Sequence, residues 1–112
     1  MCIFCEIASY RRPARLIVDE PDVIAFHDIN PQAPTHILVV PREHIASLAS
    51  PAAEDMALLG KLMLTARMVA CQAGLVEDGY RVVINTGAGA CQSVFHMHMH
   101  VLGGRRMKWP PG

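Results

Sequence analysis

The chain has 112 residues, the size of one typical domain, so we expect a single domain over residues 1–112. Ten basic and ten acidic side chains cancel, and no block of like charge is present, which argues against a nucleic-acid partner. The sequence shows neither a secretory signal nor an apolar stretch long enough for a membrane span, so we expect a cytoplasmic protein. Because 52% of this short chain is hydrophobic, we also expect some apolar surface to meet a second subunit.

The N-terminal part of the sequence predicts a short helix followed by three strands. Residues 3–10 are amphipathic over one or two helical turns. Residues 15–20 and 23–29 are rich in β-branched side chains on either side of the turn "EPD", which indicates a hairpin. The proline-rich connection "PQAPTH" then leads into an apolar strand at 35–41, which Pro41 ends.

A long helix is predicted next. Ser50 supplies a hydroxyl cap, Pro51 suits the first helical position, and Glu54 and Asp55 lie near the positive end of the helix dipole. We expect this helix to run to about Gly74. Apolar residues recur every three or four positions and should face the core: Met56, Leu58, Leu59, Leu62, Met63, Ala66, Val69 and Ala70. Cys71, within the same pattern, is expected to be a small buried hydrophobe.

Two further strands are predicted, "YRVVIN" at 80–85 and "FHMHMHVL" at 95–102, joined by the glycine-rich segment "TGAGACQS". Side chains alternate across a strand, so His96, His98 and His100 should all point to one face. A chance run of polar residues on a solvated face is one interpretation of this pattern. A catalytic metal site is a second, although same-face positions roughly 6.6–6.8 Å apart are awkward for three ligands of one ion.

A third interpretation of the histidines is nucleophilic catalysis. Neutral imidazole is abundant at pH 7 and phosphorus is a natural electrophile for it. The central imidazole, His98, has a same-face neighbour on either side. Attack through its Nε2 requires the proton on Nδ1, which should be donated, plausibly to a backbone carbonyl. The adjoining glycine-rich loop and Ser93 offer hydrogen-bond donors for a developing oxyanion.

The motif "HMHMHVL" resembles the His-φ-His-φ-His-φ-φ signature of the histidine triad (HIT) superfamily of nucleotide hydrolases and transferases. The stretches "FHDINPQAPTHILVVPREH", "GYRVVIN", "QSVFHMHMHVLGGR" and "WPPG" are similar to its Hint branch. This resemblance implies an α+β fold with about five antiparallel strands, one long helix and one short helix. It also implies a homodimer in which the sheets extend across two subunits.

The resemblance also implies roles for individual residues. His98 would be the nucleophile on the α-phosphorus, His100 and His36 would hold the phosphate and the proton network, and Ser93 would serve the leaving group. The phosphate cradle would be completed by Asn85, Gln92 and loop amides, including that of Cys91. Ala90 and Cys91 stand where the Hint loop has glycines.

The nucleoside site implied by the resemblance is largely apolar. It would comprise Phe4, Ile7, Phe26, His27 and Ile29, with Asp28 accepting hydrogen bonds from the ribose. Trp109 would reach toward the active site of the partner subunit. From the residues alone, Phe4, Ile7 and Phe26 could equally be plain core.

The cysteines allow more than one chemistry. Four cysteines could form two disulfides, but the close pair Cys2 and Cys5 in a reducing compartment favours thiols or a metal site. The "CIFC" spacing and the resemblance to zinc-binding triad proteins imply a structural zinc held by Cys2, Cys5, His44 and His96. No catalytic metal is then required. Two unmetallated thiols are the alternative.

The activity implied by the resemblance is hydrolysis at the α-phosphorus of purine nucleotides, that is, of AMP or GMP derivatives. The substrates would be nucleoside phosphoramidates and acyl- or aminoacyl-adenylates, cleaved through a nucleotidyl-histidine intermediate. Two alternatives stay open at this point: a diadenosine polyphosphate hydrolase of the same superfamily, and a nucleotide-binding module that acts by regulation rather than turnover.

Overall fold

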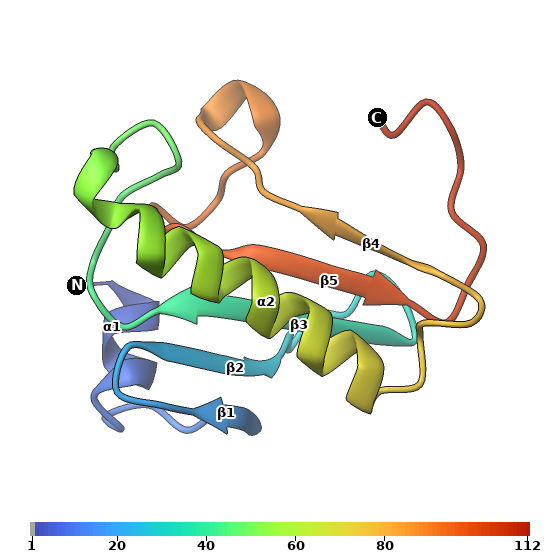
Figure 1. The fold of residues 1–112 in the computed structure, drawn as a ribbon, viewed down its shortest axis with the longest axis horizontal. Coiled ribbons are helices and arrows are strands. Elements are labelled where there is room, and N and C mark those ends of the chain that lie inside the picture. Colours follow the sequence, from blue (N-terminus) through green and yellow to red (C-terminus); the bar gives the residue numbers. More distant parts are fainter. Residues whose placement is uncertain (1) are drawn as a thin grey trace.

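The structure is a computed structural model that describes residues 2–112. Its centre is an antiparallel sheet in the strand order β1-β2-β3-β5-β4, with helix α2 lying across one face and helix α1 near the N-terminus on the other (Figure 1). The strands are β1 Leu16–Asp19, β2 Val23–His27, β3 Thr35–Pro41, β4 Tyr80–Val83 and β5 Met99–Gly103; the helices are α1 Ile3–Ala8 and α2 Met56–Gln72. The α+β fold expected from the sequence is therefore confirmed.

Two apolar cores sandwich the sheet. In β2 and β3 alternate residues face opposite ways, so Ala25 and Val39 pack with α2 while Phe26 and Leu38 pack with α1. Both strands are consequently buried on both faces, which explains why their sequences read as continuous hydrophobic runs. The histidines of the C-terminal motif pack against the smaller core around α1.

Helix α2 begins later than the sequence predicts. A 3-10 turn at Ala53–Asp55 precedes it, and the α-helix starts at Met56. The Asp55 carboxylate accepts a hydrogen bond from the Ala52 backbone N–H at 2.9 Å, so this acid, rather than Ser50, organises the entry to the helix. The end is close to the prediction, because the helix stops at Gln72 and Gly74 adopts a φ of +74°.

The buried face of α2 is only partly as predicted. Leu62, Ala66, Val69 and Ala70 are buried as expected. Met56 and Met63 were expected in the core but are 74% and 62% exposed, and Cys71 is exposed as well. The helix carries apolar side chains on both sides, so their spacing alone could not identify the side that meets the sheet.

Strand β5 is shorter than the sequence predicts. His96 and His98 precede it, and only His100 of the three motif histidines lies within the strand. The ladder between β3 and β5 ends at the pair Val39 and Met99. Alternate residues of β3 direct their backbone groups at β5, so Pro41 is the next residue whose carbonyl could continue the ladder. The Pro41 carbonyl accepts from the His96 ring, and the Met97 N–H donates to Ile45 at 2.6 Å instead of continuing the ladder.

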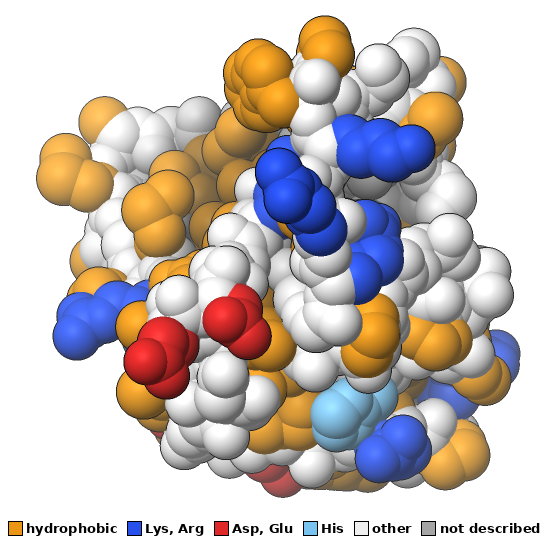
Figure 2. Space-filling model, turned by 90° about the vertical axis from the view of Figure 1, so that its right-hand side faces the viewer, with side chains coloured by type: hydrophobic (Ala, Val, Ile, Leu, Met, Phe, Trp, Pro, Cys, Tyr) orange, Lys and Arg blue, Asp and Glu red, His pale blue; other side chains and the backbone are white. Residues whose placement is uncertain are grey.

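The C-terminal segment leaves β5 at one end of the sheet and carries Arg105, Arg106, Lys108 and Trp109. Figure 2 looks onto this end, where basic side chains lie next to hydrophobic ones. Trp109 is 82% exposed. No helix in residues 2–112 has the length and apolar character that a membrane crossing requires.

A tight contact under β5 gives a test of this packing. A Cβ added at Gly103 would lie 2.7 Å from the side chain of the buried Leu75, whereas one at Gly60 would meet nothing within 4 Å. We expect Gly103→Ala to lower the free energy of unfolding by roughly 1–3 kcal/mol through overpacking. Gly60→Ala, on the exposed side of α2, should raise it by about 0.5–1 kcal/mol through helix propensity. Urea unfolding of both variants checks the prediction, and equal effects would contradict it.

Candidate active site

The three histidines expected to be catalytic come together on the α1 face of the sheet. His98 directly precedes β5, His100 lies within it, and His36 comes from the neighbouring strand β3. The ring centroids of His98 and His100 lie 4.9 Å apart, and those of His36 and His100 lie 5.1 Å apart. Asp28, directly after β2, reaches the same cluster with its carboxylate 3.3 Å from His36 Nε2.

The tautomer of His98 is set by one backbone contact. Its Nδ1 lies 2.7 Å from the carbonyl oxygen of His96, and since a carbonyl can only accept, Nδ1 carries the proton. This is the hydrogen bond that the sequence argument requires for attack through Nε2. Burial lowers the pKa of His98, so the ring is neutral near pH 7. Its Nε2 therefore presents a free lone pair.

A chain of hydrogen bonds sets the protons of His36 and His100. The Gln32 backbone N–H donates to His36 Nδ1 at 3.0 Å, so in the neutral ring the proton lies on Nε2. His36 Nε2 then donates to His100 Nδ1 at 2.8 Å, which leaves the proton of His100 on its own Nε2. Burial lowers the pKa of His36, which keeps this ring neutral. One backbone amide thus orders two imidazoles in sequence.

Two donors converge beyond the His100 ring. The Asn85 side-chain nitrogen lies 3.5 Å from His100 Nε2. Because both are donors, they cannot satisfy each other, and together they suit an anionic oxygen placed between them. Burial and the neighbouring rings of His98 and His36 lower the pKa of His100 to about 4, so it donates as a neutral imidazole.

The glycine-rich loop after β4 is shaped by Gln92. This buried side chain accepts from the Gly87 N–H at 2.9 Å and donates to the carbonyls of Ala46 and Val94 at 2.8 and 3.1 Å. Cys91 has a φ of +66°, the left-handed conformation that glycine would adopt at lower cost. Gln92 was expected in the phosphate cradle; the structure shows that its polar atoms hold the loop, and Ser93 next to it is exposed.

The residues expected around the nucleoside fall into two groups. Phe4, Ile7 and Phe26 are buried in the α1 core, and the Phe4 ring contacts His98 edge-on with centroids 5.0 Å apart. Ile29, in contrast, is fully exposed, and His27 is half-buried at the end of β2. The Asp28 carboxylate is 18% exposed and accepts from the Asn30 N–H at 2.8 Å. Trp109 is exposed in the C-terminal segment and has no place in this cluster within one chain.

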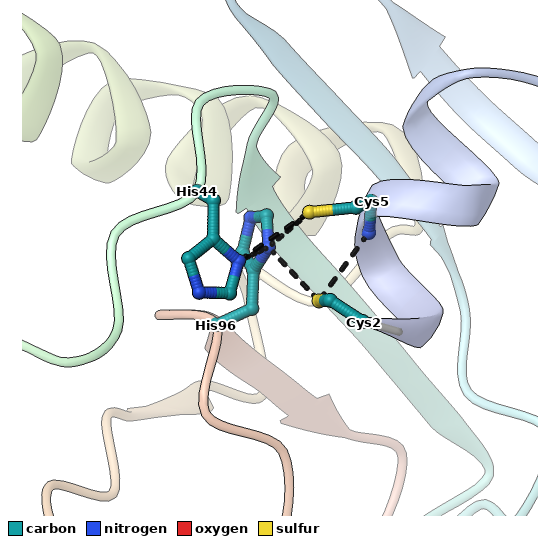
Figure 3. Close-up of side chains that lie close together, drawn as sticks. All are labelled: Cys2, Cys5, His44 and His96. Atoms are coloured by element: carbon teal, nitrogen blue, oxygen red, sulfur yellow. Dashed lines mark hydrogen bonds between the residues drawn. The ribbon is translucent and has the colours of Figure 1, made fainter.

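A second cluster lies on the other side of His96. Four side chains point toward one another: Cys2, which caps the N-terminus of α1, Cys5 within α1, His44 from the loop after β3, and His96 (Figure 3). Their potential ligand atoms all lie within 4.8 Å of one another. His96 Nε2 lies 2.7 Å from the Pro41 carbonyl and so carries a proton, which leaves the Nδ1 lone pair directed at the thiols.

The distances in this cluster match a tetrahedral zinc site. Zinc–sulfur and zinc–nitrogen bonds of about 2.3 and 2.1 Å at tetrahedral angles give S···N separations of about 3.6 Å and N···N separations of about 3.4 Å. The Sγ atoms of Cys2 and Cys5 lie 3.3 and 3.5 Å from His96 Nδ1, and His44 Nδ1 lies 3.2 Å from it. The Pro41 carbonyl supplies the outer hydrogen bond that metal-binding imidazoles usually make.

The group formed by Asp28, His36 and His100 also has ligand atoms within 4.8 Å of one another. A metal there would require a lone pair on His36 Nε2, and hence a proton on His36 Nδ1. That proton would face the Gln32 N–H, which already donates to the same atom. Hydrogen bonds therefore account for the close approach of these three side chains.

Sequence reasoning missed the Gln32 amide and the Pro41 carbonyl, because backbone atoms leave no signal in residue identity.

Known proteins match this sequence over nearly the whole chain. The HIT domain family matches residues 10–107. The chain is 50% identical to a 14 kDa zinc-binding protein of Zea mays, over 98% of this chain and 87% of that protein. It is 46% identical to the adenylylsulfatase HINT1 of Arabidopsis thaliana, over 98% and 76% of the two chains.

Solved structures agree with this assignment. The crystal structure of a HIT family hydrolase from Legionella pneumophila Philadelphia 1 superposes with a TM-score of 0.98. It is 45% identical, and the match covers all of both chains. The family match, the identity to these relatives and the shared fold all concern the part of the chain that holds the histidine cluster. The chain belongs to the HIT domain family.

Proposed function

We propose that this protein hydrolyses purine nucleoside phosphoramidates and acyl- or aminoacyl-adenylates at the α-phosphorus. The observation that carries the proposal is the 2.7 Å hydrogen bond between His98 Nδ1 and the His96 carbonyl. It leaves Nε2 of a buried, neutral imidazole as a nucleophile beside two convergent donors, Asn85 and His100. A nucleotide-binding module that acts without turnover would not need a nucleophile prepared in this way.

The reaction would proceed in two displacements at phosphorus. His98 Nε2 forms a bond to the α-phosphorus while the bond from phosphorus to the leaving nitrogen or oxygen breaks. The positive charge that develops on the ring is stabilised through Nδ1–H by the His96 carbonyl. Water then attacks the same phosphorus, the bond to Nε2 breaks, and the nucleoside monophosphate is released.

The surrounding residues would stabilise charge and position the substrate. His100 Nε2–H and Asn85 would hold the phosphate oxygens, with His36 keeping the proton of His100 in place. The exposed hydroxyl of Ser93 would assist the departing group, and loop amides near Cys91 would complete the cradle. The base would lie against Phe4, Ile7, Phe26, His27 and Ile29, and Asp28 would accept from the ribose hydroxyls.

The relatives support this chemistry. A HIT family hydrolase and an adenylylsulfatase are among the proteins to which the chain is similar. An adenylyl sulfate presents an α-phosphorus with a good leaving group, as do acyl-adenylates and protonated phosphoramidates. The shared step is nucleophilic substitution at an adenylylated phosphorus, which is the step that the His98 geometry supports.

We propose zinc as the occupant of the cluster formed by Cys2, Cys5, His44 and His96. The two thiols, the two imidazole nitrogens and their separations suit a tetrahedral structural site with no open position. When bound, the metal would supply cross-linking between α1, the loop after β3 and the segment before β5. It would not contact the substrate, so no catalytic metal is needed.

We also propose a homodimer. Apolar side chains are exposed along the outer side of α2, with Met56 74%, Met63 62% and Leu64 61% exposed. Strand β4 is an edge strand, and Met63 lines an apolar hollow of ≈ 220 Å³ together with Leu48 and Ile84, the residue that follows β4. A second copy meeting this face would cover the helix and extend the sheet. Trp109 would then be available to the partner's active site.

Replacement of the nucleophile tests the proposed activity. We expect His98→Asn to lower turnover of an adenosine phosphoramidate by several orders of magnitude, while AMP binding by calorimetry is retained. His100→Ala should cost less, since this residue orients charge rather than forming a bond. Rapid quench of the native protein should trap the nucleotidyl group on His98. Near-normal turnover in His98→Asn, or trapping on another residue, would rule out this mechanism.

Metal analysis tests the zinc proposal. Protein purified under reducing conditions without chelator should contain one zinc per chain, and Cys5→Ser should contain much less. Because zinc binding contributes on the order of 10 kcal/mol in structural sites, the metal-depleted protein should also unfold at a lower temperature. Cys71→Ser, which changes an exposed thiol outside the cluster, is the matched control. Native protein with reduced thiols and no metal would contradict the proposal.

Sedimentation tests the dimer. The native protein at micromolar concentration should sediment as a dimer, and Met63→Glu should shift it toward monomer because the charge would be buried at the interface. Gln72→Glu adds the same charge at the end of α2 and should leave the dimer intact. A native protein that sediments only as monomer would show that the exposed apolar face has another purpose.

A further inference from the structure

We propose that the metal cluster positions the catalytic nucleophile, so that its occupancy controls the rate of the chemical step in addition to stability. His96 is the connection: its ring belongs to the cluster and its carbonyl holds His98. This inference rests on the proposed hydrolase function and on zinc as the occupant. It assigns positioning roles to Cys2, Cys5 and His44, none of which faces the substrate.

The first connection runs through the backbone of His96. The ring is completely buried and is held by the Pro41 carbonyl at Nε2 and by the thiols and His44 at Nδ1. The peptide that follows this ring provides the oxygen that fixes His98 Nδ1. The segment lies outside strand β5, so no ladder hydrogen bonds hold it. It is oriented by the His96 ring, by the hydrogen bond from Met97 N–H to the Ile45 carbonyl, and by the Met97 side chain, which packs in the α2 core on the other face.

The second connection runs through helix α1. Phe4 lies between the two thiol ligands in the sequence, and its ring contacts both His96 and His98 edge-on, with centroids 5.9 and 5.0 Å apart. A helix of six residues is too short to be stable alone. Its far end is held by Arg42, which donates to the Ala8 carbonyl, and its near end by the cluster. Release of the thiols would therefore loosen the end of α1 that carries Phe4, whose ring packs on His98.

A merely structural centre would behave differently. It would lower stability when emptied but leave the folded fraction as active as before. A positioning centre lowers the rate constant of the folded protein, because His98 Nδ1 loses its fixed acceptor and Nε2 loses its alignment. The hold on the phosphate should change little, since the proton of His100 is set by the separate chain that begins at Gln32.

His44 offers the cleanest variant. It is exposed, and its contacts are with Cys5 and His96 of the cluster. His44→Ala removes one of the four ligands, whereas His44→Cys keeps four ligands as a Cys₃His set that zinc commonly accepts. Val69→Ala, in the α2 core across the sheet, controls for a general loss of stability.

Four quantities would be measured on each folded variant: zinc content, the single-turnover rate with an adenosine phosphoramidate, the Kd for AMP, and the ¹H–¹⁵N signal of His98 Nδ1–H. We expect His44→Ala to lose zinc, to slow single turnover by roughly 10–100-fold with a Kd within a few-fold of native, and to lose the slowly exchanging His98 signal. His44→Cys should restore the zinc content, the single-turnover rate and the His98 signal, and Val69→Ala should change none of these.

The inference is wrong if zinc-free His44→Ala keeps the native single-turnover rate and the native His98 signal. It is equally wrong if Val69→Ala slows turnover as much as His44→Ala does. Failure of the proposed function would look different, because the native, zinc-loaded protein would then not cleave the phosphoramidate at all. In that case the His98 signal and the Kd for AMP still decide whether the cluster positions His98.

Discussion

The hydrogen bond between His96 Nε2 and the Pro41 carbonyl fixes more of this molecule than any other single contact. It places the His96 proton on Nε2, turns the Nδ1 lone pair toward the thiols of α1, and ends the pairing of β3 with β5. Because the strand ends there, the backbone at His96 is free to present its carbonyl to His98. One buried ring thereby connects the sheet, the thiol cluster and His98.

Residue types in the site could be predicted from the sequence, but the atoms that order them could not. The spacing of His96, His98 and His100 indicates one shared face, and the "CIFC" spacing indicates a ligand pair. The atoms that decide the tautomers are the amide of Gln32 and the carbonyls of Pro41 and His96. Every residue has such groups, so only the fold determines which of them meets an imidazole.

The errors in the fold prediction have similar physical causes. His96 and His98 alternate as strand residues do, yet they precede β5 because the ring of His96 takes the carbonyl that a ladder would use. Met56 and Met63 have helical spacing, yet they lie on the exposed side of α2. Periodicity identifies an apolar stripe but cannot say whether the sheet or another surface covers it when both sides of a helix are apolar. The outer stripe of α2 therefore carries no information about the core.

The low pKa of His100, about 4, means that the ring proposed to hold the phosphate carries no charge near neutrality, and burial keeps His36 and His98 neutral as well. A phosphate held here would be held by short-range dipoles from rings and amides rather than by the field of a cationic patch. Ionic screening acts mainly on interactions between net charges. Nucleotide capture at this site should therefore vary little with salt concentration, unlike capture by a cleft lined with lysine and arginine.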